Sequence, residues 1–150
     1  MSSHYVLLLI LRISVFGTFF GHGCLALRFV PGWLPYLGVV GIGTKWARIL
    51  MPVIGLLDII IAFVCLFMDA CPLVYCWAFV WGLATALIRP IAGESIFGFI
   101  ERTGNFCPAL ALLRLASGQD FGYYLMICTL MTSILAIFGV IFRVTGLMKN

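Results

Sequence analysis

Charged residues are scarce in this chain. Only 9% of its 150 residues are Asp, Glu, Lys or Arg, whereas 64% are hydrophobic. Soluble domains carry roughly 25% charged residues, and a chain of this length has too little interior to hide so much apolar surface. The composition therefore excludes an ordinary soluble domain and predicts an integral membrane protein. It also gives no reason to expect a nucleic-acid partner.

The chain also lacks the motifs of common enzyme chemistry. It has six cysteines but no C-x-x-C pair, no glycine-rich phosphate loop, no serine–histidine–acid order and no zincin motif. No metal ligands stand at a recognised spacing, and His4 and His22 are too far apart to hold a haem together. We expect no catalytic site, no metal and no cofactor of established type. The cysteines are expected to be small packing residues, with a disulfide among Cys65, Cys71 and Cys76 as the alternative.

Four segments are long and apolar enough to cross roughly 30 Å of hydrocarbon at about 1.5 Å per residue. The predicted spans are Val6–Leu27, Ile49–Met68, Cys71–Ile88 and Tyr123–Phe142. They indicate an all-α membrane protein whose single domain, 1–150, is a bundle of four transmembrane helices. The first segment follows no basic stretch and exceeds the length of a signal-peptide core, so we expect it to be retained as a span.

The connections between these spans differ greatly in length. Asp69 and Ala70 alone separate the second span from the third, which predicts a tight antiparallel hairpin with Asp69 as the cap and Pro72 in the first helical turn. The third connection is long and contains two short helical patterns, at 94–102 and 108–116. We expect these to form interfacial helices, the second either on the surface or re-entrant.

Basic residues are distributed unevenly over the expected loops. The side with the first and third connections has the larger set, which is Arg28, Lys45, Arg48, Arg89, Arg102 and Arg114, against Arg143 and Lys149 on the other side. The positive-inside rule places the two long connections in the cytoplasm or its equivalent, with both termini outside. The membrane would be a bacterial inner membrane or an organellar membrane.

Small residues recur at helical spacing in every predicted span, and in lipid such faces let helix backbones approach closely. In the second span they accompany a carboxylate: Gly55, Asp58, Ala62 and Cys65. The stripes of the other spans are Ser14, Gly17, Gly21 and Cys24; Ala78, Gly82, Thr85 and Arg89; and Thr129, Thr132, Ser133, Ala136 and Gly139. We expect all four faces to point inward and to form one tight bundle.

Asp58 is the residue that most needs an explanation, because an ionisable group at bilayer depth costs at least a few kcal/mol unless it has a partner or a polar cavity. It is either a structural group, ion-paired or protonated and hydrogen-bonded, or a proton-relay or ligand site. His22 is close enough in depth to reach it, although a hydrogen bond to a carbonyl would also account for this histidine. Arg89 and Glu94 form either a helix-end ion pair or, with His22, an anion-binding corner. The candidate polar cluster is therefore Asp58, His22, Arg89 and Glu94.

Several short motifs resemble those of the DoxX-like group of small four-span membrane proteins, over roughly Leu7 to Leu113. They are Leu11-Arg12, Gly21-His22-Gly23, Gly55-x-x-Asp58, Arg89-Pro90-x-x-Gly93-Glu94 and Phe99-Ile100-Glu101-Arg102-x-Gly104-Asn105. Some proteins of that group are similar to membrane subunits of quinone-linked sulfur oxidoreductases. The resemblance implies an accessory or quinone-proximal role.

Two functions are compatible with the sequence. The first is a non-catalytic accessory or assembly subunit of a membrane complex, possessing no activity of its own, whose bundle binds partner helices, lipid or a quinone head group near His22, Asp58 and Arg89. It would work with other membrane subunits or by self-association. The second is a small oligomeric proton-coupled transporter in which Asp58 is the protonatable carboxylate.

Overall fold

The structure is a computed structural model that describes residues 3–68 and 71–149, and over these residues it consists of helices and their connections, with no strand. The four long helices are α1 (Ser3–Leu27), α3 (Thr44–Phe67), α4 (Pro72–Ile91) and α7 (Phe121–Thr145). The shorter ones are η1 (Pro31–Trp33), α2 (Leu34–Val39), α5 (Ile96–Glu101), α6 (Thr103–Ser117) and η2 (Gly118–Asp120). Within the described residues, α1, α3, α4 and the stretch that ends with α7 are long and apolar enough to cross a membrane. The prediction of an all-helical chain with four such helices is confirmed.

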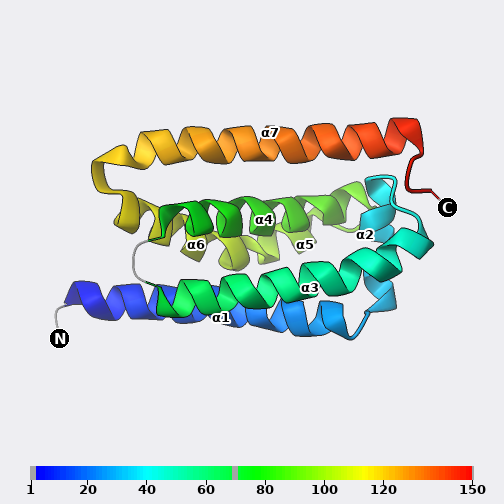
Figure 1. Ribbon diagram of the computed structural model, residues 1–150. Helices are drawn as coiled ribbons and strands as arrows, with labels where there is room; N and C mark the ends of the chain where they lie inside the picture. The colour runs from blue at the N-terminus through cyan, green and yellow to red at the C-terminus, as the bar shows by residue number, and fades with distance from the viewer. Residues whose placement is uncertain (1–2, 69–70, 150) are drawn as a thin grey trace.

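The long helices run side by side, with α4 in the centre (Figure 1). One side of α4 packs on α6 and another on α7, while α1 and α3 form a closely packed pair of their own. The core lies where α1, α3, α4 and α6 meet, and its largest fully buried side chains include Tyr75, Leu112 and Leu113. In water, burial of one such aliphatic side chain stabilises a fold by about 1.5–3 kcal/mol. Lipid chains are as apolar as the side chains, so in a membrane the stability has to come from close packing between the helices.

The α1–α3 pair is held at its closest point by two glycines. A Cβ atom added to Gly23 would lie 2.7 Å from the Gly55 carbonyl oxygen, and one added to Gly55 would lie 2.8 Å from the Gly23 carbonyl oxygen. The predicted packing face of the second span is confirmed, because Gly55, Asp58, Ala62 and Cys65 are all buried. The prediction for the first span is wrong: Gly17 and Gly21 are exposed with open space around them. The buried face of α1 is instead Val15, Phe19, Gly23 and Ala26, since only Gly23 lies where the two backbones cross.

The third connection differs most from the prediction. The helix expected at 108–116 begins at Thr103 and places Pro108 inside it, and its buried residues Phe106, Leu112 and Leu113 pack in the core. Phe106 lies against Gly82 of α4, and this burial extends the helix upstream of the proline. A separate short helix does form at Ile96–Glu101. Whether these helices lie at a membrane interface stays a prediction.

The return pass of α6 also changes where the chain ends. Because α6 runs back along α4, α7 starts at the end of the molecule where α1 starts, and the two termini lie at opposite ends (Figure 1). The C-terminal segment meets the α2–α3 connection, where the Gly43 amide donates a 2.6 Å hydrogen bond to the Met148 carbonyl. The predicted placement of both termini on one side is therefore wrong, because a helix of only 15 residues was not expected to recross the bundle.

The expected hairpin between the second and third spans is only partly described. Asp69 and Ala70, including the predicted cap at Asp69, lie outside the described residues. Pro72 is the first residue of α4, as predicted. However, α3 packs mainly on α1 and only sparsely on α4, because α6 occupies the small-residue face of α4 at Gly82.

The six cysteines are all free thiols. Cys65, Cys76 and Cys128 are buried, and the Cys76 thiol lies 3.6 Å from the Tyr124 carbonyl oxygen. Their role as small packing residues is confirmed, and the alternative of a disulfide among Cys65, Cys71 and Cys76 is wrong for this structure.

Candidate functional site

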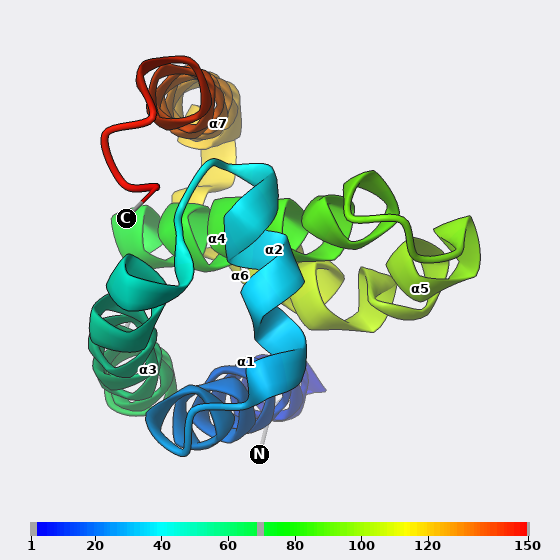
Figure 2. The same cartoon turned by 90° about the vertical axis from the view of Figure 1, so that its right-hand side faces the viewer.

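A cavity of about 450 Å³ lies between α1, α3 and α4. Its walls are mostly apolar, and α7 contributes one side through residues such as Leu135 and Phe142. At one end the cavity is lined by the segment Pro31–Val39, made of η1 and α2, which we call the cap segment. Figure 2 looks onto this end and shows η1 and α2 running from the end of α1 towards α4, along one side of the space between α1, α3 and α4. The polar side chains that line the cavity are Thr18, His22, Trp33, Tyr36, Asp58, Trp81, Thr85, Arg89, Arg102, Asn105 and Thr132.

Three of the four predicted site residues, His22, Asp58 and Arg89, line this one cavity. Glu94 does not line it, but it lies at the rim through its ion pair with Arg89. The sequence pattern therefore located residues that the fold brings together from α1, α3 and α4.

Asp58 is 6% exposed and faces the cavity from α3. Its polar partner is the Trp81 indole of α4, whose N–H is the donor in their hydrogen bond. Among the residues that the structure describes, Asp58 forms no ion pair, and His22 bonds to Arg102 instead of Asp58. Desolvation of the carboxyl group is thus offset by an indole hydrogen bond and by the cavity it faces. Trp81 is itself held in place by stacking on Trp77, with 5.6 Å between ring centroids.

His22 bonds to a cation instead of an acid. Nη1 of Arg102 lies 3.3 Å from Nε2 of His22, and the Trp33 ring of the cap segment meets the imidazole edge-on at 5.9 Å. A guanidinium only donates hydrogen bonds, so Nε2 must be the acceptor and the imidazole proton must be on Nδ1. His22 is therefore a neutral group that orients the side chain of Arg102.

Arg89, Glu94 and Tyr36 form a small network, which we call the latch, at the edge of the cap segment. Arg89 Nη1 donates to Glu94 Oε2 at 3.0 Å, the Tyr36 hydroxyl donates to Glu94 Oε1, and the Arg89 guanidinium stands 5.0 Å from the Tyr36 ring centroid. The hydrogen bond from Tyr36, followed by the charge of Arg89, holds the pKa of Glu94 below its ordinary value. Partial burial and the bond to Glu94 raise the pKa of Tyr36. The latch ties α2 to the end of α4, so the helix-end ion pair expected for Arg89 and Glu94 also holds the cap segment.

Sequence reasoning missed three residues of the site: Arg102, Tyr36 and Trp81. Arg102 was considered only as a basic residue of the third connection and as part of a family motif, because no local sequence pattern indicates that α6 returns into the bundle. Tyr36 lies in the connection before the second span, where no local pattern indicates that its hydroxyl reaches Glu94. Trp81 precedes Gly82 on the small-residue stripe, and its spacing from Trp77 was the available signal for an ordered aromatic pair.

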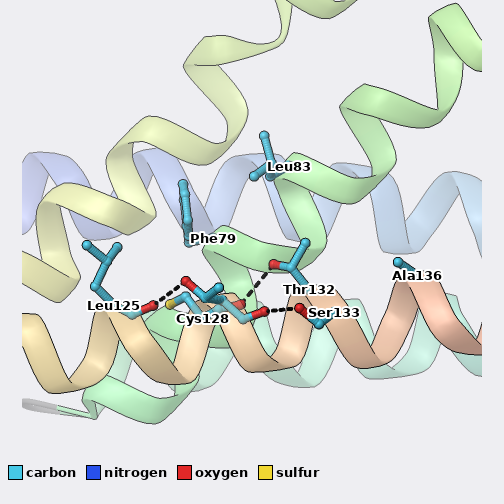
Figure 3. A pocket seen from close by; sticks show the side chains of 8 residues that line it. Phe79, Leu83, Leu125, Cys128, Thr132, Ser133 and Ala136 are labelled. Atoms are coloured by element: carbon cyan, nitrogen blue, oxygen red, sulfur yellow. Dashed lines mark hydrogen bonds between the residues drawn. The ribbon is translucent and has the colours of Figure 1, made fainter.

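A second hollow, of about 360 Å³, lies between α4 and α7 (Figure 3). It is lined by Phe79 and Leu83 from α4 and by the predicted small-residue stripe of α7. The hydroxyls of that stripe are already used, since Thr129, Thr132 and Ser133 each donate to a carbonyl one turn earlier in α7. Of α7 only Cys128 is buried. The expectation that four small faces form one tight bundle is therefore wrong for α7, which packs loosely against α4.

No group of three or more His, Cys, Asp or Glu side chains that could hold a metal ion occurs in the described parts of the chain. Comparison with protein-family models, with curated proteins and with solved structures finds no match to this chain. The resemblance to the DoxX-like group thus stays a prediction, carried by the sequence motifs alone.

Proposed function

We propose that this chain is an integral membrane protein in which α1, α3, α4 and α7 cross the bilayer. The support comes from the outward faces of these helices, which expose large apolar side chains along their length, such as Ile10, Ile60 and Ile137. Soluble monomers rarely expose contiguous apolar surface beyond a few hundred Å². In a bilayer these side chains contact lipid chains, so their exposure carries no free-energy cost.

We further propose that the end carrying the cap segment faces the cytoplasm or its equivalent. The helix ends gathered there bring together the basic residues Arg28, Lys45, Arg48, Arg89, Arg102, Arg143 and Lys149, while Arg114 closes α6 at the other end. Because α6 runs back along the bundle, Arg143 and Lys149 join the basic residues at this end, so the positive-inside rule favours a cytoplasmic position for it more strongly than the predicted loops did. In this orientation the N-terminus is outside and the C-terminus is inside. The exposed Ile96, Phe97 and Ile100 of α5 would then lie in the interface.

The function we propose is that of a non-catalytic accessory or assembly subunit, DoxX-like in kind, that holds one amphipathic membrane molecule in the α1–α3–α4 cavity. A quinone head group or a lipid is the candidate ligand, and other membrane subunits or further copies of the chain are the candidate partners. The observation that carries this proposal is the cavity itself, because about 450 Å³ of mainly apolar space with a few convergent polar groups is typical of small-molecule sites.

The test is native mass spectrometry and lipid extraction of the protein solubilised from membranes in mild detergent. We expect one retained amphipathic molecule per chain, and its loss in Thr18→Phe, which fills the cavity from α1. Ile13→Phe, on the exposed face of the same helix, is the matched control and should retain the molecule. A chain that is isolated as a lone monomer with nothing bound would refute the proposal.

The alternative, a proton-coupled transporter, is favoured by one observation: Asp58 is buried and lines the cavity. If it carries the transported proton, Asp58→Asn should abolish proton flux into liposomes, since the amide cannot titrate. Unchanged flux in Asp58→Asn would remove this function and leave the carboxyl group as the structural partner of Trp81.

A further inference from the structure

Arg102 differs from Arg89 and Arg48, two other cations at the same end of the molecule, in having no anionic or aromatic partner among the described residues. Arg89 is paired with Glu94, and Arg48 stands over the Phe29 ring. Within the described parts of the chain, Arg102 bonds only to the neutral His22, and its Nε atom is buried without a hydrogen-bond partner. Over residues 3–68 and 71–149, no carboxylate forms an ion pair with it.

A partly buried cation without an ion-pair partner is costly. A guanidinium has five N–H donors, and each one that is withdrawn from water without an acceptor costs on the order of 1–3 kcal/mol, more for a charged group. Arg102 lines an apolar cavity, so a ligand that enters this cavity meets a guanidinium that has no ion-pair partner among the described residues. The Asn105 side chain, one turn further along α6, lines the same wall and adds an amide donor.

The positions of Arg102 and Asp58 in the cavity set the direction of such a ligand. Trp81 is the polar group that faces Asp58, whereas Arg102 lies beside His22 and near Tyr36 and Glu94 at the capped end. An anionic group would be attracted to the Arg102 side, and the Asp58 carboxyl group would repel it when ionised. Between them, the walls offer apolar contact for a hydrocarbon chain.

We propose that the cavity binds an amphiphile with an anionic oxygen head group, a carboxylate or a phosphate, whose head bonds to Arg102 and whose acyl chain occupies the apolar part of the cavity. This inference rests on the proposed function and names the chemical class of its ligand. The neutral His22 accepts a hydrogen bond from Nη1 of Arg102 and fixes the guanidinium at the cavity wall. The cap segment closes over the head group through Trp33 and Tyr36.

The experiment uses the full chain in phosphatidylcholine vesicles at a pH where fatty acids are ionised. Binding of a fluorescent long-chain fatty acid, its methyl ester and a fluorescent lysophosphatidic acid is followed by energy transfer from the protein's tryptophans. Inorganic phosphate, added as a competitor, distinguishes a free anion from a lipid head group. The variants are Arg102→Gln, Arg102→Lys and Arg48→Gln, the last a matched charge loss at the same end of the molecule but outside the cavity.

The wild-type chain should bind the acid or the lysophosphatidic acid at least tenfold more tightly than the ester. Arg102→Gln should weaken binding of the acidic probe about tenfold to a hundredfold, as expected for a lost charge-assisted hydrogen bond, and leave the ester unchanged. Arg102→Lys should recover part of the loss, which shows that the Gln variant is not simply misfolded, and Arg48→Gln should match the wild type. Competition by phosphate alone would assign the site to a free anion and overturn the acyl-chain part.

Two failures can be told apart. If the ester binds as tightly as the acid and Arg102→Gln changes nothing, the anionic head group is refuted while a ligand-binding cavity stands. If none of the probes binds the wild-type chain and native mass spectrometry finds no retained molecule, the proposed function fails together with this inference.

Discussion

Replacement of Gly23 by alanine tests the α1–α3 packing on which the cavity depends. The added Cβ would lie 2.7 Å from the Gly55 carbonyl oxygen and 2.7 Å from Ile59 Cγ1, about 0.7 Å inside the 3.4 Å at which ordinary contact begins. The Ile59 side chain can turn away, but the Gly55 carbonyl belongs to the backbone of α3. The two helices must therefore separate or tilt, and overpacking of this kind costs about 1–3 kcal/mol.

Gly21→Ala is the matched control, since it makes the same chemical change two residues earlier in the same helix. A Cβ at Gly21 meets nothing within 4 Å, so this variant should gain up to about 1 kcal/mol from the higher helix propensity of alanine. Both variants would be unfolded with increasing SDS in mixed micelles and followed by tryptophan fluorescence. Equal stability of Gly23→Ala and Gly21→Ala would refute the glycine contact and the position of α1 on α3.

Three other predictions follow from the site. Asp58→Leu should lower the free energy of unfolding in the same SDS titration by about 1–3 kcal/mol, because it leaves the Trp81 indole N–H without an acceptor. Asp58→Asn keeps an acceptor oxygen and should be close to wild type in stability. Equal losses of stability in the two variants would exclude the indole bond. Tyr36 and Arg89 hold the pKa of Glu94 below the ordinary 4.5, so the latch should be intact at neutral pH and lost only as the pH falls through that lowered pKa. The fluorescence of Trp33 in the cap segment should change at the pH where the latch is lost. In Tyr36→Phe, which removes one of the bonds to Glu94, this change should occur at a higher pH. Maleimide labelling of the folded chain should modify the exposed Cys107 and spare the buried Cys65, Cys76 and Cys128, with rapid labelling of the buried three contradicting the core described here.

Local patterns predicted the long helices and much of the site, and each success has a physical reason. Long apolar runs can satisfy their backbone in lipid only as helices, so the four long helices follow from composition. Asp58 was expected to be buried because a charge at that depth needs a partner, and its spacing from Gly55, Ala62 and Cys65 identified the correct face of α3.

The errors concern relations between distant segments. Gly17 and Gly21 have the spacing of a small-residue packing face, yet no described atom lies within 4 Å of a Cβ added to either glycine. The reason is that α3 crosses α1 at Gly23 instead. The return of α6 depends on Phe106 packing against Gly82, a contact that neither segment reveals by itself. The return of α6 brings Arg102 next to His22 and places the C-terminus at the capped end. Because the return was not predicted, Arg102 was missed as a site residue and the C-terminus was predicted at the wrong end.

A density map of the protein in lipid nanodiscs tests the central claim most directly, namely that α1, α3 and α4 enclose a ligand-holding cavity with Asp58 on one wall and Arg102 near the cap segment. The account predicts elongated density inside the cavity, with its polar end within hydrogen-bonding distance of Arg102 and the Asp58 carboxyl group turned inward to Trp81. A cavity closed by collapsed side chains, or an Asp58 carboxyl group facing the acyl chains of the surrounding lipid, would contradict it.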